Sequence, residues 1–181
     1  MNKNTNCDSL DIAVNIEYLA ATKETTEEDI NKAIKTALEN NVKMTRGLSM
    51  DYRASLRELM EKRNMNFTDI AYETLTEKEL LISPDAVGNI INGKANPKPG
   101  SLILICCALR LPYNVSMDIL MKANCMPSYY NWNSEKQEYD DAYALVDQIM
   151  QATAGQKAEV FFNYLKMFGI KIEKKALNFH F

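Results

Sequence analysis

The spacing of apolar residues changes near the start of the chain. From Leu10 to Tyr18, apolar residues occupy every second position, which is the period of a strand with one buried face. The run Thr26–Asp29 is typical of a capped, acidic first turn, and apolar residues at helical spacing follow from Ile30 to Leu38. The pattern predicts a strand and then a helix that ends near Asn40.

A first short helix is predicted after residue 66. Asn66 can accept hydrogen bonds from the free amides of a helix start, and Asp69 three residues later completes a capping pattern. Its buried side is expected to hold Ile70, Ala71 and Leu75.

A second short helix is predicted after Ser83. Ser83 can cap it, Pro84 has the φ angle of a first helical residue, and Asp85 favours the positive end of the helix dipole. Asn92-Gly93 tolerates the left-handed conformation that ends a helix. The apolar stripe between these limits is Val87, Ile90 and Ile91.

The pattern after residue 123 predicts a linker, two helices and a strand. The linker Cys125–Glu135 holds aromatic residues that we expect to pack onto a neighbouring surface. Leu177–Phe181 alternates again, and we expect this strand to pair with Leu10–Tyr18, within one subunit or across a dimer. The two helices have their apolar faces at Tyr139, Tyr143, Val146 and Met150, and at Phe161, Leu165 and Phe168, with Gly169 as the terminator of the second.

Ordered motifs extend through residues 52–123. They are Leu56-Arg57-Glu58-Leu59, Met65–Ala71, Asn92-Gly93-Lys94 with Asn96-Pro97, Ala108-Leu109, and Val115–Asp118 with Leu120. In this order they resemble the helix-turn-helix domain of the Cro and lambda-repressor type (XRE family) of bacterial and phage regulators. The resemblance implies a compact five-helix fold.

Pattern and resemblance together predict a mainly α protein in three parts. Residues 1–50 are expected to form an N-terminal strand-helix segment, and residues 51–126 a lambda-repressor-like helix-turn-helix domain. Residues 127–181 are expected to form a C-terminal helical extension. A small two-stranded β element completes the expected fold.

The resemblance implies where DNA would bind. In this family the third helix enters the major groove, which here corresponds to Pro84–Ile91. Asn89 is the strongest base reader, because a carboxamide can pair with N6 and N7 of adenine, whereas Asp85 can accept only from cytosine N4 and is repelled by phosphates. The residues expected to bind DNA are Asn66, Ser83, Pro84, Asp85, Ala86, Asn89, Asn92, Lys94 and Asn96.

The chain departs from the family pattern at three places. Phe67 stands where the family often has a glutamine that reaches a phosphate. Met60 and Ile91 stand where several relatives have an Arg and a Glu that pair, so both are expected in the core. The connection Leu75–Ile82 is longer than the family's tight turn, and the spacing of Thr76 and Glu79 predicts an added helical turn within it.

Gly88 lies in the middle of a predicted helix. A glycine there costs about 1 kcal/mol relative to alanine, which indicates close approach to another group. A neighbouring helix is the favoured explanation.

Charge argues for a weak electrostatic attraction to DNA. The chain of 181 residues has a formal net charge of −3. Lys and Arg against Asp and Glu number 6 and 9 in residues 1–51, 9 and 8 in residues 52–126, and 6 and 7 in residues 127–181. The net of +1 in the middle part is far from the basic stripe of a strong binder, so affinity would need geometry or dimerisation.

The remaining composition points away from metals, cofactors and catalysis. The four cysteines have no CxxC spacing, and His180 is the lone histidine, so a zinc site and a catalytic constellation are not supported. Cys106 and Cys107 are favoured as core thiols over redox sensors. No apolar run approaches the roughly 20 residues of a membrane span, and residues 1–11 are polar, so we expect a cytoplasmic protein without a membrane partner.

The sequence therefore favours a sequence-specific double-stranded DNA-binding transcriptional regulator. We expect it to act as a homodimer, with no cofactor and no enzymatic activity, and no small-molecule ligand is inferable. The alternative is a protein-interaction or scaffold module of the same fold with weak or no DNA binding. The acidic balance, Phe67 and the poor set Pro84, Asp85 and Gly88 favour that alternative.

Overall fold

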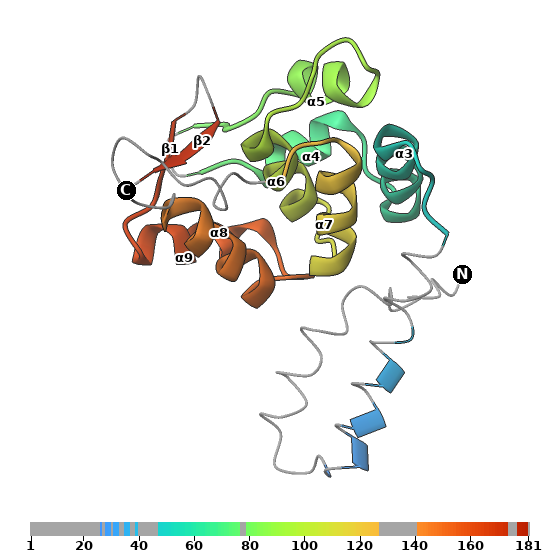
Figure 1. The fold of residues 1–181 in the computed structure, drawn as a ribbon, viewed down its shortest axis with the longest axis vertical. Coiled ribbons are helices and arrows are strands. Elements are labelled where there is room, and N and C mark those ends of the chain that lie inside the picture. Colours follow the sequence, from blue (N-terminus) through green and yellow to red (C-terminus); the bar gives the residue numbers. More distant parts are fainter. Residues whose placement is uncertain are drawn as a thin grey trace, which may run out of the picture.

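The computed structural model describes residues 26, 28–29, 31–32, 35–36, 39, 47–76, 79–126, 141–173 and 177–180. This part of the chain is mainly helical with one small antiparallel sheet (Figure 1). Its elements are α3 (Tyr52–Arg63), α4 (Phe67–Glu73), α5 (Pro84–Ile91), α6 (Pro99–Ala108), α7 (Tyr113–Lys122), α8 (Asp141–Ala152), α9 (Ala158–Met167), β1 (Lys171–Glu173) and β2 (Asn178–His180).

The predicted helix start at Thr26 is confirmed. The Asp29 amide donates to Thr26 Oγ1 at 3.2 Å, and the Thr26 amide donates to Asp29 Oδ2 at 3.1 Å. The described residues between 28 and 39 are helical and exposed. The predicted strand Leu10–Tyr18 and nearly all of the predicted linker Cys125–Glu135 lie outside the described residues.

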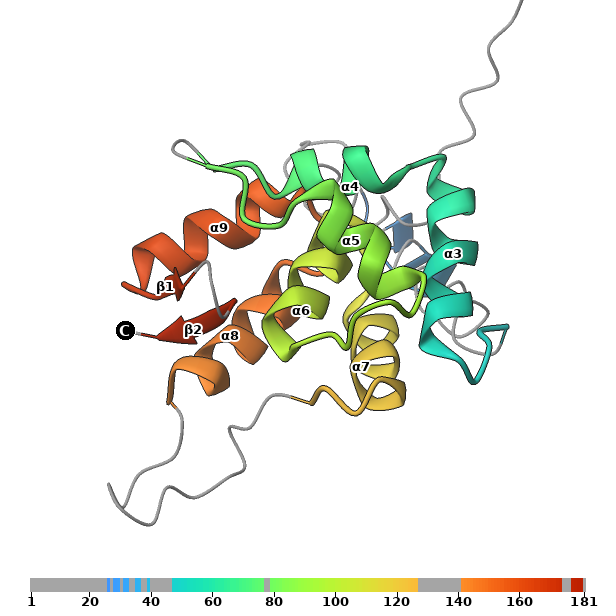
Figure 2. The ribbon, with the colours of Figure 1, turned by 90° about the horizontal axis from the view of Figure 1, so that it is seen from above.

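Helix α6 lies at the centre of the described fold. It packs against α4 and α7 on one side and against α9 and β2 on the other (Figures 1 and 2). Its residues from Gly100 to Cys106 are buried, because its sequence is apolar on every face. One core cluster of buried residues consequently runs from α3 through α6 to β2.

The connection between α4 and α5 contains no helix among its described residues, so the predicted helical turn is wrong. The Glu79 amide donates to Thr76 Oγ1 at 3.3 Å, but the Thr76 amide donates to the Glu79 carbonyl at 2.9 Å, and Leu75 forms an antiparallel bridge with Leu80. Buried Thr74 anchors this turn, since its carbonyl accepts from the Leu81 amide at 3.3 Å and its hydroxyl oxygen accepts from the Ile82 amide at 3.4 Å. A threonine side chain that accepts from an amide three residues later occurs in hairpin turns as well as at helix starts. Here the backbone pairing of Leu75 with Leu80 makes the segment a turn.

Both predicted C-terminal helices are present, as α8 and α9. Phe161 and Leu165 are buried as expected, and Gly169 ends α9 with a φ of +73°. Phe168 was expected on the buried face, but it is 44% exposed, because it occupies the cap position where the helical spacing ends.

The terminal strand is confirmed as β2, but its described partner was not foreseen. β2 pairs antiparallel with β1, with Ile172 opposite Phe179. The short Lys171–Glu173 run has no alternation long enough to be read as a strand. The Phe179 ring packs edge to face on Tyr143 at 5.6 Å and on Phe161 at 6.2 Å between ring centroids, so the hairpin closes the core over α8 and α9.

The described C-terminal elements join the preceding helices through polar contacts as well. The Tyr113 hydroxyl on α7 donates to Asp147 Oδ1 on α8 at 2.8 Å. The Gly155 amide donates to the Leu111 carbonyl at 3.2 Å. These bonds fix α8 against the turn that precedes α7.

Candidate nucleic-acid interface

Helix α4 begins at a complete capping box. Asn66 Oδ1 accepts from the amides of Thr68 at 2.8 Å and Asp69 at 3.1 Å, while Asp69 Oδ2 accepts from the Asn66 amide at 2.8 Å. The exposed Asn66 side chain therefore has its oxygen occupied by the cap and retains its NH₂ group as a donor toward solvent.

Helix α5 begins as its sequence predicts. Ser83 Oγ accepts from the Ala86 amide at 3.2 Å, and Pro84 takes the first helical position. Asp85 is exposed in the first turn, whereas Pro84 and Ala86 are half-buried.

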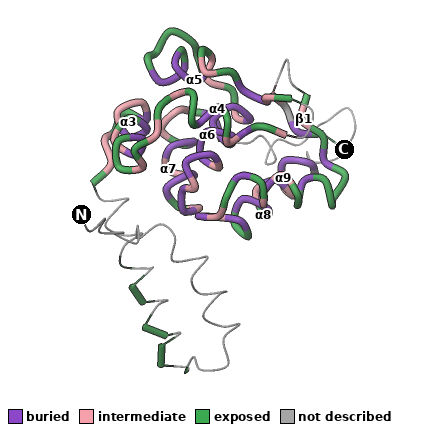
Figure 3. Tube along the Cα trace, turned by 180° about the vertical axis from the view of Figure 1, so that it is seen from behind, coloured by how far each residue is buried: buried purple, intermediate pink, exposed green. Residues whose placement is uncertain are grey.

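The core contacts of α5 fix which side faces outward. Val87, Ile90 and Ile91 are buried, and α5 packs on α3 and α4. Asp85, Asn89 and Asn92, spaced by four and three residues, form an exposed stripe on the opposite side of the helix. We call these three residues the α5 stripe. Helix α5 itself lies at the edge of the described fold (Figure 3).

Asn89 is placed to recognise a polar partner. Its backbone carbonyl accepts from the amides of Lys94 at 2.8 Å and Ala95 at 3.1 Å, which folds the following turn back against the helix end. Within the described part of the chain, its exposed carboxamide makes no hydrogen bond. Gly93, with a φ of +74°, permits this turn, and Lys94 and Asn96 on it are exposed.

Gly88 is buried against Phe67 of α4. A Cβ atom at Gly88 would lie 3.1 Å from Phe67 Cδ2, so the absence of a side chain lets the ring pack between α4 and α5. The favoured explanation for Gly88, close approach of a neighbouring helix, is confirmed. Phe67 packs against the core and sets the spacing of the two helices.

The expected burial of Met60 and Ile91 is also confirmed. Met60 on α3 and Ile91 on α5 belong to the same core cluster. Two apolar side chains at these positions contribute burial energy without the desolvation cost of an ion pair.

Two arginines of α3 reach the C-terminal end of α5. Arg57 Nη2 donates to the Ile91 carbonyl at 2.8 Å, where a cation is favoured by the helix dipole. The Arg53 guanidinium lies over the Tyr52 ring at 4.9 Å and beside Gly93. With Lys94, which follows Gly93, these residues form a cationic edge beside the α5 stripe. Because 34 residues separate Arg57 from its partner, sequence periodicity gave no signal for this contact.

The thiols behave as core groups. Burial raises the pKa of Cys106 to about 12, although a hydrogen bond with Ser116 acts in the opposite direction. Burial also raises the pKa of Cys107 well above its usual value, and that of Cys125 less strongly. The predicted core placement is confirmed for Cys106, which is 1% exposed, whereas Cys107 is half-buried against the core.

The described residues provide little for other chemistry. No group of three His, Cys, Asp or Glu side chains among them is arranged to hold a metal ion. None of the helices in the described ranges is both long and apolar enough to cross a bilayer.

Comparison of the chain with protein-family models, with curated proteins and with solved structures found no match.

Proposed function

We propose that this chain is a double-stranded DNA-binding transcriptional regulator whose helices α3–α7 form a lambda-repressor-like helix-turn-helix domain. In this proposal α4 and α5 are the two helices of the motif, and α5 enters the major groove. The order of the five helices, the caps at Asn66 and Ser83, and the packing of α5 on α4 support the fold proposal. The proposal includes a cytoplasmic location for this regulator.

The observation that carries the functional proposal is the exposure of the α5 stripe. A recognition helix must present several side chains beyond its own bundle to enter a groove about 12 Å wide. Asp85, Asn89 and Asn92 are exposed, while the other side of the same helix is anchored in the core. The outward face is therefore rigidly held and accessible.

Each exposed residue has a distinct role in the proposed complex. Asn89 reads adenine through two hydrogen bonds, a contact that discriminates by about 1–3 kcal/mol. Lys94, Asn96 and the NH₂ group of Asn66 contact phosphates, together with Arg53 and Arg57 at the cationic edge. Asp85 accepts from cytosine N4 and repels the phosphate backbone elsewhere, so it opposes binding to sequences that lack that base.

Fluorescence anisotropy with duplex DNA at two salt concentrations tests the proposal. We expect binding that weakens as salt rises, and Lys94→Ala should lower the slope of log affinity against log salt by about 1. Lys62→Ala is the matched control, because Lys62 lies on α3 in an ion pair with Glu58. Asn89→Ala should relax sequence preference in a selection from random duplexes, while Asn114→Ala, an exposed asparagine on α7, should not.

Absence of binding at low salt would overturn the regulator proposal and favour the interaction or scaffold module. Asp85 is the observation that favours the interaction or scaffold module, because an exposed carboxylate in the first turn of α5 repels phosphates. Asp85→Asn separates the two functions. A regulator should gain non-specific affinity with this variant, whereas an interaction module should still show no DNA binding.

A further inference from the structure

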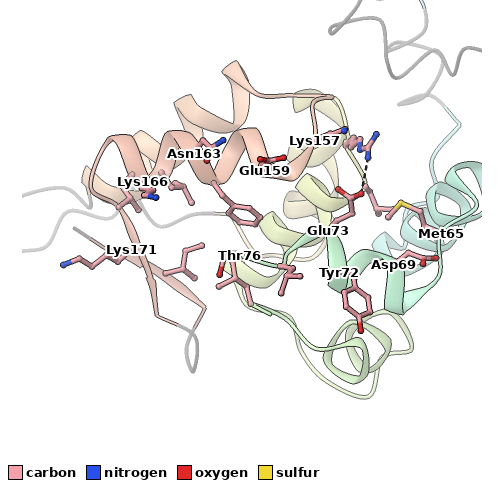
Figure 4. A pocket seen from close by; sticks show the side chains of 18 of the residues that line it. Met65, Asp69, Tyr72, Glu73, Thr76, Lys157, Glu159, Asn163, Lys166 and Lys171 are labelled. Carbon is pink, nitrogen blue, oxygen red and sulfur yellow. Dashed lines mark hydrogen bonds and ion pairs between the residues drawn. The ribbon is translucent and has the colours of Figure 1, made fainter. Parts of the chain in front are cut away.

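A long groove lies between α4 with its following turn and α9 with β1 (Figure 4). Its volume is about 1330 Å³, which exceeds the roughly 300–1,000 Å³ of sites for small molecules. It lies outside the α5 stripe and shares none of its residues. The dimensions suit a segment of polypeptide better than a small ligand.

The groove exposes apolar side chains that the fold leaves uncovered. Tyr72 on α4 is 62% exposed. Leu75 was predicted on the buried side of this helix, but that is wrong: it is 53% exposed, because α4 ends at Glu73 and Leu75 lies on the following turn. Phe162 on α9 also lines the groove and is half-buried. Apolar residues gathered in one concave surface mark an interaction site more reliably than the same residues scattered singly.

The groove lining is more basic than the chain as a whole. It includes Arg63, Arg110, Lys157, Lys166 and Lys171 against Asp69, Glu73 and Glu159. Two of the carboxylates are already engaged: Glu73 pairs with Arg110 at 3.1 Å, and Asp69 accepts from the Asn66 amide. An occupant with acidic residues beside an apolar stripe is therefore complementary to the groove.

The helix within residues 26–39 has the matching chemistry. Its first turn is acidic and closed by the Thr26–Asp29 capping box, and its described residues are all exposed and polar. The sequence predicts an apolar stripe from Ile30 to Leu38 on the remaining positions. A helix of this length is marginal alone and depends on packing of its apolar side. Within one chain its described residues lie apart from the groove, on the α3 side (Figures 1 and 2).

We propose that the groove of one chain binds the helix of residues 26–39 from a second copy, and that the exchange is reciprocal. The apolar stripe packs on Tyr72, Leu75 and Phe162, and the acidic first turn lies against the lysines of α9 and β1. A two-fold arrangement uses each contact twice and closes the assembly as a dimer. This interface forms without DNA, so its test is independent of the DNA-binding proposal.

Analytical ultracentrifugation of the full chain without DNA tests the exchange. The wild type should dimerise, and Leu75→Lys and Ile34→Lys should each weaken the dimer by about tenfold or more. The matched controls are Met121→Lys, an exposed apolar position on α7 that is 64% exposed, and Thr36→Lys on the exposed side of the 26–39 helix. Neither control should change the dimer.

Mixing the two defective variants gives the sharpest outcome. The Ile34→Lys chain keeps an intact groove and the Leu75→Lys chain keeps an intact helix, so their mixture retains one of the two contacts. It should contain more dimer than either variant alone. Far-UV circular dichroism establishes folding, and Leu75→Ser replaces Leu75→Lys if the charged variant unfolds.

Three results would overturn the proposal. The first is a wild type that remains monomeric at all concentrations, as expected if the helix covers the groove of its own chain. The second is a dimer that persists unchanged in both variants, which would place the interface elsewhere. The third is a mixture that forms no more dimer than either variant alone, although both variants are folded.

Discussion

Helices α5 and α6 begin with similar caps but differ in how far they are buried. Each has a proline in its first turn, Pro84 in α5 and Pro99 in α6, and each start is closed by a serine hydroxyl. In α6, Ser101 Oγ accepts from the Lys98 amide at 2.9 Å. Beyond the first turn, α5 has the exposed residue Asn89 among buried ones, whereas α6 is buried almost throughout.

The difference separates residues that hold the fold from residues that are available for binding. Helix α6 contacts elements on both sides, so its side chains fill the core whichever way they point. Helix α5 has neighbours on one side only, and its outer side chains have no packing role. Substitutions on α6 should therefore lower stability, and those on the α5 stripe should leave it nearly unchanged.

The largest expected effect is a cavity in α6. Ile105→Ala should lower the free energy of unfolding by about 2–5 kcal/mol, because Ile105 is fully buried in the core cluster. Asn89→Ala on α5 should change it by no more than about 0.5 kcal/mol. Urea unfolding measures both, and equal losses would contradict the division between the two helices.

The glycines of the two helices offer a second, smaller contrast. A Cβ atom at Gly100 of α6 would clash with the Leu177 backbone carbonyl, so Gly100→Ala should displace the β1–β2 hairpin and cost about 1–3 kcal/mol. At Gly88 the nearest obstacle is the Phe67 ring, and alanine regains about 1 kcal/mol of helix propensity. Gly88→Ala should therefore cost less.

Urea unfolding compares these two glycine variants, and near-ultraviolet circular dichroism reports the rings around Phe179. A larger loss in the free energy of unfolding for Gly88→Ala than for Gly100→Ala would show that the Leu177 backbone contact does not make Gly100 the more restricted position.

The last expected effect is a pH dependence that arises at Cys106 in α6. Because burial raises the pKa of Cys106 from 9.0 to about 12, the folded chain holds this proton more tightly than the unfolded chain. The stability that the neutral thiol contributes is complete below the unfolded pKa and falls as pH rises above it, by at most about 1.4 kcal/mol per pH unit.

Unfolding measured between about pH 9 and about pH 11 should show a shallower decline for Cys106→Ala than for the wild type. Asn89→Ala, which removes no thiol, should keep the wild-type slope. A Cys106→Ala slope equal to that of the wild type would show that other groups dominate in this range.

Contacts between residues close in sequence allowed several helix starts to be predicted from the sequence. The caps at Thr26, Asn66 and Ser83 rely on bonds between residues close in sequence, and all three form as predicted. The same reasoning misread Thr76 and Glu79, because a threonine cap bond also fits a hairpin turn and the backbone pairing of Leu75 with Leu80 settled the outcome. Strand β1 was missed because three residues are too short to show a period.

For the candidate interface, amphipathic spacing was enough to predict that Val87, Ile90 and Ile91 face the core. Exposure of Asp85, Asn89 and Asn92 then follows from helical geometry. The arrival of Arg53 and Arg57 at the end of α5 could not be predicted, because nothing in a local pattern gives the crossing of α3 and α5.

The sequence by itself determined where α4 and α5 begin and which side of α5 is apolar. Helix caps and apolar spacing act over a few residues and carry that information locally. Only the tertiary structure decided that Phe67 fills the space left by Gly88, that Leu177 closes on Gly100, and that a basic, partly apolar groove remains between α4 and α9. These features depend on how distant surfaces meet, and the packing of whole side chains sets that arrangement.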